Sequence, residues 1–136
     1  MFEFFEHTAD LGLRARAESL NDLFAEGAKA LFAAILIQPE EIQPLEETQF
    51  HLEEADPACL FRDWLALLLT HFEADKKVFT RFQVFVQSST LRATARGEMF
   101  DAARHGRNHE VKAITYHGLL LTQADGQWLA EVIVDI

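Results

Sequence analysis

The chain has 136 residues, of which 49% are hydrophobic and twelve are phenylalanine, and its formal net charge is −10. It is long enough for one domain, residues 1–136, with a sizeable core, and too apolar for a disordered protein. No apolar run approaches the roughly 20 residues of a membrane span, and the N-terminus lacks the pattern of a secretory signal. We therefore expect a soluble cytoplasmic protein that makes no contact with a membrane.

The charge is unevenly distributed along the chain. The acidic excess argues against a general nucleic-acid binder, because affinity for phosphates is built from lysine and arginine. Residues 38–56 contain seven acids and no base, a connection to which we assign no function. Residues 92–112 contain five bases. One interpretation is a binding face for RNA or for an acidic protein, and the other is an ordinary solvated surface. These bases are Arg92, Arg96, Arg104, Arg107 and Lys112.

Apolar periodicity predicts two helices and seven strands. Ser19, with Asp22 three residues later, is a capping pattern that begins a helix ending at Pro39. Gly27 lies inside that helix, where it indicates close packing. Asp56 and Pro57 begin a second helix, which runs from Ala58 to about Phe72. Period-two alternation and β-type composition predict strands at 2–6, 11–17, 48–53, 78–86, 91–97, 114–122 and 127–135.

The order of these elements predicts the fold class. Two strands, a helix, a strand and a second helix precede four strands joined by hairpin signals, among them Asp125-Gly126. Residues 100–109 are polar and are expected to form a loop or a short helical turn. The economical arrangement is an α+β domain with two helices packed on one face of a largely antiparallel sheet.

Several signatures of catalysis are missing from the sequence. It has no phosphate-binding P-loop, no dinucleotide fingerprint, no nucleophile elbow and no zinc-protease helix motif. Cys59 lies in the first turn of a helix, where the dipole favours a thiolate, although a small buried side chain is the commoner role. His105 and His109 have a zinc-compatible spacing, but Gly106 separates them and no third ligand is near. We therefore expect solvated loop histidines there.

A possible cluster of three carboxylates is the strongest indication of chemistry in the sequence. If the first and last strands lie near each other in the sheet, Asp10, Asp135 and the terminal carboxylate of Ile136 could converge. Three carboxylates at close range cannot all stay ionised unless a positive group lies between them. Oxygen ligands suit Ca²⁺ or Mg²⁺, whereas a nitrogen from His7 would suit a transition metal. The alternative, in which Asp10 caps a turn and Asp135 is solvated at a fraying end, stays open.

The sequence resembles the archease family over its whole length. The matching runs are Phe5-Glu6-His7-Thr8-Ala9-Asp10-Leu11-Gly12, Arg62-Asp63-Trp64-Leu65 with Val78-Phe79, Gly97-Glu98-Met99-Phe100-Asp101, Glu110-Val111-Lys112-Ala113-Ile114-Thr115-Tyr116-His117-Gly118-Leu119, and Ala130-Glu131-Val132-Ile133-Val134-Asp135-Ile136. The resemblance implies a strand-helix-strand-strand module with an inserted part.

The resemblance also implies a function. Archeases are non-enzymatic accessory proteins of the RtcB-type RNA ligase, which joins tRNA halves using GTP and a divalent metal. They promote guanylylation and multiple turnover of the ligase, can broaden its nucleotide use, and are involved with tRNA indirectly. The family also has a chaperone-like link to tRNA methyltransferases, which is one alternative here. A small metal-dependent enzyme, with His7 or His117 as the general acid or base, is another.

The family's metal site carries over completely onto this chain. Its ligands correspond to Asp10, Asp135 and the terminal carboxylate of Ile136, and the resemblance favours Ca²⁺, with Mg²⁺ or Mn²⁺ as alternatives. Lys112 lies inside a matching run, and our hypothesis is that it faces the ligase or the phosphates of its nucleotide. His7 is expected either to orient Asp10 or to contact the ligase.

Overall fold

The computed structural model describes residues 1–7 and 10–136, so Thr8 and Ala9 of the opening motif lie outside the described residues. The strands form two antiparallel sheets. The larger sheet contains β1 (Phe2–His7), β2 (Asp10–Ala17), β6 (Ala113–Ile114), β7 (Leu120–Ala124) and β8 (Gln127–Asp135). The smaller sheet contains β3 (Glu46–Glu53), β4 (Lys77–Gln87) and β5 (Thr90–Met99).

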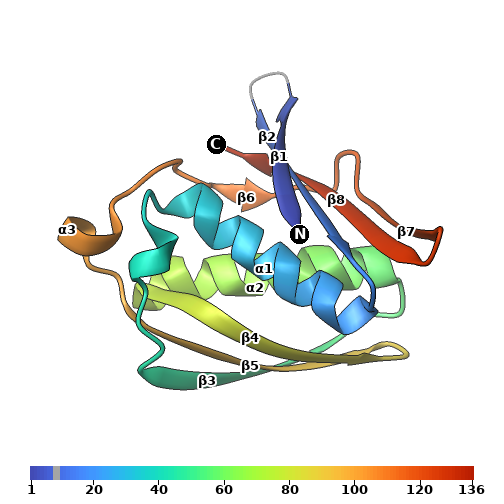
Figure 1. Cartoon of the computed structure of the whole chain (residues 1–136), viewed down its shortest axis with the longest axis horizontal. Helices are drawn as coiled ribbons and strands as arrows, with labels where there is room; N and C mark the ends of the chain where they lie inside the picture. Colours follow the sequence, from blue (N-terminus) through green and yellow to red (C-terminus); the bar gives the residue numbers. More distant parts are fainter. Residues whose placement is uncertain (8–9) are drawn as a thin grey trace.

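Two long helices, α1 (Leu20–Ile35) and α2 (Pro57–Asp75), lie between the two sheets (Figure 1). Helix α1 contacts β2 of the larger sheet and β4 of the smaller one, so a single helix joins both layers. Two short helical turns, η1 (Pro39–Glu41) and α3 (Ala102–His105), lie at one end of the molecule. No helix among the described residues is both long and apolar enough to cross a membrane.

Helix α1 begins as the capping pattern predicts. The Ser19 hydroxyl accepts a hydrogen bond from the Asp22 amide at 3.1 Å, which satisfies one of the unpaired donors of the first turn. Gly27 is buried against α2, and a Cβ atom at this position would lie 2.5 Å from the Phe61 ring. The predicted close packing at Gly27 is therefore confirmed, because any larger residue would displace the Phe61 ring.

Helix α2 also begins where the sequence predicts. The Asp56 carboxylate accepts hydrogen bonds from the amides of Ala58 and Cys59, at 2.8 and 3.2 Å. The helix continues three residues beyond the expected end at Phe72, and Lys76 closes it with a left-handed backbone at φ 57°. The Trp64 indole is fully buried and donates to the Phe24 carbonyl of α1 at 3.0 Å, so the two helices are joined by a polar contact within the core.

The strand order β1-β2-β8-β6 brings the two ends of the chain together. Strand β8 pairs with β2 along its length, with Val132 and Val134 facing the helices and fully buried. Because side chains alternate along a strand, Glu131 and Asp135 project from the opposite, outer face. The last strand therefore lies near the first, with β2 between them, and it is the second strand that pairs with β8.

The α+β class with antiparallel pairing is confirmed, but helix α1 ends at Ile35, before the expected Pro39, and the number of sheets and one strand also differ from expectation. The strands are divided between two sheets, each of which presents one face to the helices. The single strand expected at 114–122 is wrong, since β6 ends at Ile114 and β7 begins at Leu120. The intervening residues include Gly118, whose φ of +65° breaks the extended conformation.

Candidate functional site

The candidate site is one row of side chains across the outer face of the larger sheet. His7 is paired with Asp10 between β1 and β2, and Asp10 is paired with Asp135 between β2 and β8. Directly opposed residues in an antiparallel pair project from the same face, about 4.5–5.5 Å apart at Cβ. The pairing therefore places the imidazole and the two carboxylates in one row on the same face of the sheet.

His7 has an unusual polar environment. Its Nδ1 atom lies 3.5 Å from Asp10 Oδ2, and it is buried without a hydrogen-bond partner among the described residues. The His7 ring also packs edge-on against His117, with the ring centroids 5.5 Å apart. A buried nitrogen without a partner costs free energy, and no hydrogen bond within residues 1–7 and 10–136 offsets that cost for His7 Nδ1.

The row borders an open hollow of about 650 Å³ at the edge of the sheet. Its lining includes His7, Asp10, His109 and the C-terminal residue, Ile136. Among the described residues, no lysine or arginine forms an ion pair with either Asp10 or Asp135. Two carboxylates directly opposite each other repel, so the bare row lowers the stability of the sheet.

The chemistry of these donors fits a divalent cation. Two ligands about 2.1 Å from one ion at a tetrahedral angle lie about 3.4 Å apart, close to the separation of His7 Nδ1 and Asp10 Oδ2. A bound ion would also account for the unpartnered nitrogen. The described part of the chain has no group of three or more His, Cys, Asp or Glu side chains placed to hold a metal.

An arginine of helix α2 holds the connection between β6 and β7 beside this row. Arg62 donates to the Ile114 carbonyl at 2.9 Å and to the Tyr116 hydroxyl at 3.1 Å. Its guanidinium also lies over the Tyr116 ring, 4.4 Å from the centroid, while 61% of Tyr116 remains exposed. The motifs containing Arg62 and Tyr116 are 54 residues apart, and periodicity alone did not predict that they meet.

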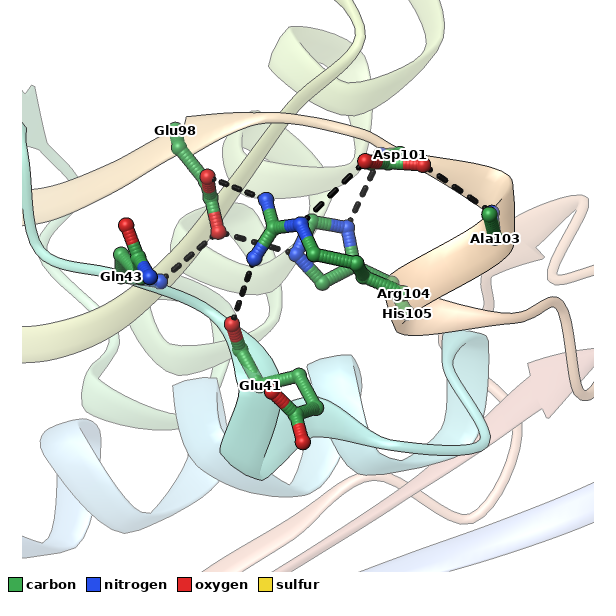
Figure 2. Close-up of polar contacts among 7 residues, drawn as sticks. All are labelled: Glu41, Gln43, Glu98, Asp101, Ala103, Arg104 and His105. Atoms are coloured by element: carbon green, nitrogen blue, oxygen red, sulfur yellow. Dashed lines mark hydrogen bonds and ion pairs between the residues drawn. The ribbon is translucent and has the colours of Figure 1, made fainter.

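A second polar cluster lies between the end of β5 and α3 (Figure 2). The Glu98 carboxylate accepts hydrogen bonds from the Arg104 side chain and from the Gln43 amide, the latter at 2.8 Å. His105 Nδ1 accepts from the Asp101 amide, so its Nε2 carries the proton and donates to Glu98 at 3.0 Å. The cluster ties the segment after α1 to α3.

The cluster changes the interpretation of two sequence features. His105 is fully buried and bonded to Glu98, so the expectation of a solvated loop histidine is wrong for this residue. His109 instead lines the hollow beside Asp10. Burial alone would raise the pKa of Glu98, but hydrogen bonds from Arg104, the Gln43 amide and His105 outweigh it and lower the pKa to about 2.

Cys59 does not have the environment of an activated nucleophile. Partial burial, together with the carboxylates of Asp56 and Glu54, raises the pKa of its thiol. This effect is opposite to the lowering that a helix N-terminus can produce, and a reactive cysteine needs its thiolate form. The structure therefore favours the interpretation of Cys59 as a small packing residue.

The five bases between residues 92 and 112 do not form one face. Arg104 belongs to the Glu98 cluster, and the Arg107 guanidinium lies 5.1 Å from the Phe72 ring centroid. Lys112 is exposed just before β6, and its amide donates to the Asp135 carbonyl at 2.7 Å. Only Arg92 and Arg96 share a surface, on β5 of the smaller sheet.

Comparison with known proteins places the whole chain in one family. Residues 2–136 match the Archease protein family (MTH1598/TM1083). Protein archease from Methanopyrus kandleri is 37% identical over 139 residues, covering 99% of both chains. Protein archease from Sulfolobus acidocaldarius is 35% identical over 137 residues, covering 99% of this chain and 98% of its own.

Solved structures show the same fold. The solution structure of Methanobacterium thermoautotrophicum protein 1598 is 32% identical, with a TM-score of 0.88 and coverage of 99% of this chain and 98% of its own. The crystal structure of an archease from Thermotoga maritima, described as a possible chaperone, is 20% identical and matches with a TM-score of 0.68. It covers 100% of this chain and 98% of its own. On this evidence, the chain belongs to the Archease protein family.

Proposed function

We propose that this protein is a non-enzymatic activator of an RtcB-type RNA ligase, and that it acts through a divalent ion held by Asp10, Asp135 and the terminal carboxylate of Ile136. The proposed activity is promotion of ligase guanylylation and of multiple turnover. Membership of the Archease family supports the accessory role. The row of His7, Asp10 and Asp135 supports the metal-dependent part of the proposal.

The direct opposition of Asp10 and Asp135 is the observation that carries this proposal. A protein selected only for stability would place a base or a neutral group opposite one of these acids, because opposed like charges destabilise a sheet. Polar groups that violate such local rules are expected at functional sites. The unpartnered nitrogen of His7 beside the same row points to the same place.

Each residue of the row has a distinct role in the proposed site. Asp10 and Asp135 supply carboxylate oxygens from neighbouring strands, whose pairing fixes their separation before any ion binds. Ile136 supplies the main-chain carboxylate, and the His7 imidazole, whose Nδ1 lies 3.5 Å from Asp10 Oδ2, orients the Asp10 carboxylate. When bound, the ion neutralises the carboxylates and provides Lewis-acid coordination positions for groups of the partner. These oxygen donors favour Ca²⁺, with Mg²⁺ or Mn²⁺ as alternatives.

A ligation assay tests the proposed activity directly. An RtcB-type ligase is incubated with excess RNA halves and GTP, with and without this protein, and joined product per ligase is measured over time. We expect this protein to raise the product above one equivalent per ligase and Asp10→Asn to lose most of that effect. Normal stimulation by both Asp10→Asn and Asp135→Asn would contradict the metal-dependent account.

Two alternatives give different results in related assays. A small metal-dependent enzyme would process phosphorylated or RNA substrates without any ligase present. A chaperone of a tRNA methyltransferase would be captured with that enzyme from native extract, whether or not divalent ions are added. An activator of the proposed kind is instead captured with the ligase, more strongly with divalent ion than with chelator.

A further inference from the structure

The outer face of the smaller sheet is open to solvent, since both long helices pack against its inner face (Figure 1). We call this surface the open face. Its side chains form three rows across β3, β5 and β4, in which the residues are directly opposed. These rows are Glu47–Arg96–Arg81, Gln49–Thr94–Gln83 and His51–Arg92–Phe85.

The open face is more basic than the rest of the protein. It carries three arginines, Arg81, Arg92 and Arg96, in a chain whose net charge is −10. Arg96 forms an ion pair with Glu47 at 2.8 Å, whereas Arg81 and Arg92 form none with the described residues. The remaining charged groups are Glu53 at the end of β3 and His51, whose Nε2 lies 3.8 Å from Glu53.

Two hollows lie next to each other on this face and meet at Thr94. One measures about 290 Å³ and is lined by Arg81, Gln83 and Arg96 among others. The other measures about 350 Å³, and its lining includes Arg92 and Phe85. The first hollow is lined by two guanidinium groups and the second by one, which can bind phosphate, and both contain a glutamine amide and the Thr94 hydroxyl, which can reach the edge of a base.

Phe85 distinguishes this surface from an ordinary solvated sheet. Its side chain is 57% exposed and lies directly opposite Arg92. An aromatic ring beside a guanidinium on an open sheet is suited to stacking with unpaired bases, while neighbouring arginines hold the backbone. An acidic peptide would satisfy the arginines, but it would give the exposed ring no planar partner.

We propose that the open face binds single-stranded RNA, with Arg81, Arg92 and Arg96 contacting phosphates and Phe85 stacking on a base. This inference goes beyond the proposed function and does not depend on it. The helical layer separates the open face from the row of His7, Asp10 and Asp135. The result of an RNA-binding experiment with this protein alone is therefore independent of whether the protein stimulates a ligase.

Fluorescence anisotropy tests the proposal. A labelled oligouridine of ten nucleotides is titrated with the full-length protein in the absence of ligase. We expect Phe85→Ala to weaken binding about five-fold or more, with little change in its salt dependence. Replacing all three arginines by glutamine should weaken binding at least about ten-fold. The logarithmic salt slope should also become shallower by about 0.7 for each phosphate that the variant no longer binds.

Glu47→Gln provides a test that loss of folding cannot mimic. Glu47 forms the ion pair with Arg96. Removing the charge of Glu47 frees Arg96 to bind a phosphate, so oligouridine should bind more tightly and its affinity should depend more steeply on salt. Lys29→Gln is the control for net charge. Lys29 is exposed on α1, outside the open face, and its removal should leave the affinity within about two-fold of the wild type.

Three results would overturn the proposal. The first is an absence of oligouridine binding at low salt. The second is binding that Lys29→Gln weakens as much as substitution of an open-face arginine does. The third is a combination of two observations. A ten-residue polyglutamate displaces oligouridine when the two are compared at the same concentration of negative charge, and Phe85→Ala has no effect on binding. That combination would identify an acidic protein as the occupant.

Discussion

Asp10 and Asp135 lie directly opposite each other in the antiparallel pair of β2 and β8, although 125 positions separate them in the sequence. The first polar motif of the chain and its last charged side chain thereby form one surface. Neither carboxylate has a lysine or arginine partner among the described residues. This like-charged pair is the basis of the proposed metal site and of the first two predictions.

Asp135→Asn should separate metal binding from folding. Removing one of two opposed charges relieves repulsion, so the free energy of unfolding without metal should stay equal or rise by about 0.5 kcal/mol. Stabilisation by added Ca²⁺ should disappear, because ligand binding to the native state is what raises the unfolding temperature. Thermal unfolding with and without Ca²⁺ measures both effects.

Asp125→Asn is the matched control for that substitution. Asp125 lies in the turn between β7 and β8 with a φ of 54°, a conformation that asparagine also accepts, and it is exposed. This variant should retain the full stabilisation by Ca²⁺. Equal loss in both variants would mean that net charge, and not the row, determines the response.

Extending the chain beyond Ile136 should weaken the same site by a different route. A short Gly-Ser extension converts the terminal carboxylate into a peptide group, which leaves both aspartates in place but removes one charged donor. We expect weaker Ca²⁺ affinity in isothermal titration calorimetry and an unchanged far-UV circular dichroism spectrum. Unaltered affinity would remove Ile136 from the proposed ligand set.

Glu98→Gln should make stability less dependent on pH in acid. The Glu98 carboxyl has an ordinary pKa of 4.5 when unfolded, and this pKa falls to about 2 in the native protein. Its stabilising contribution is therefore complete above pH 4.5 and is lost as the pH falls from 4.5 towards 2. The variant should lose about 2 kcal/mol at neutral pH, the usual cost of removing a charged hydrogen-bond partner.

Urea unfolding of wild type and Glu98→Gln at several pH values from 7 to 3 measures this difference. The two free energies of unfolding should converge as the pH decreases, since protonation removes the same charge that the substitution removes. A constant difference across that range would show that Glu98 stabilises the protein by packing and not as an ionised carboxylate.

Lys112→Ala should reduce ligase stimulation without loss of stability. The side chain is exposed and forms no ion pair with the described residues, while its amide is held to the Asp135 carbonyl. This placement beside the proposed site suits contact with the ligase or with nucleotide phosphates. Lys29→Ala, on helix α1, is the control. Equal stimulation by both variants would mean that Lys112 does not contact the ligase.

Much of the local structure could be predicted because its signals are short-range. Ser19 and Asp56 cap the two helices as expected, and Gly27 makes the predicted close contact. Strand β8 has the alternation predicted for residues 127–135, with Val132 and Val134 fully buried and Asp135 exposed. These features depend on residues within a few positions of each other or on a simple period, both of which are visible in a single sequence.

The pairing of distant segments could not be predicted in the same way. Nothing local indicates that β5 is the central strand of a separate sheet, or that Gly97 lies so near β4 that a Cβ atom would be 1.8 Å from the Val78 carbonyl oxygen. The burial of His105 depends on Glu98, seven residues earlier on another element. Polar spacing alone suggested a solvated loop there.

Formation of the guanylylated ligase tests the central claim most directly. Radiolabelled GTP, an RtcB-type ligase and a divalent ion are combined with this protein, and the covalent nucleotide on the ligase is counted. The account predicts that wild type and Asp125→Asn accelerate labelling equally, whereas Asp135→Asn folds normally but fails to accelerate it. Equal acceleration by Asp135→Asn would contradict the claim that the Asp10–Asp135 row is what acts on the ligase.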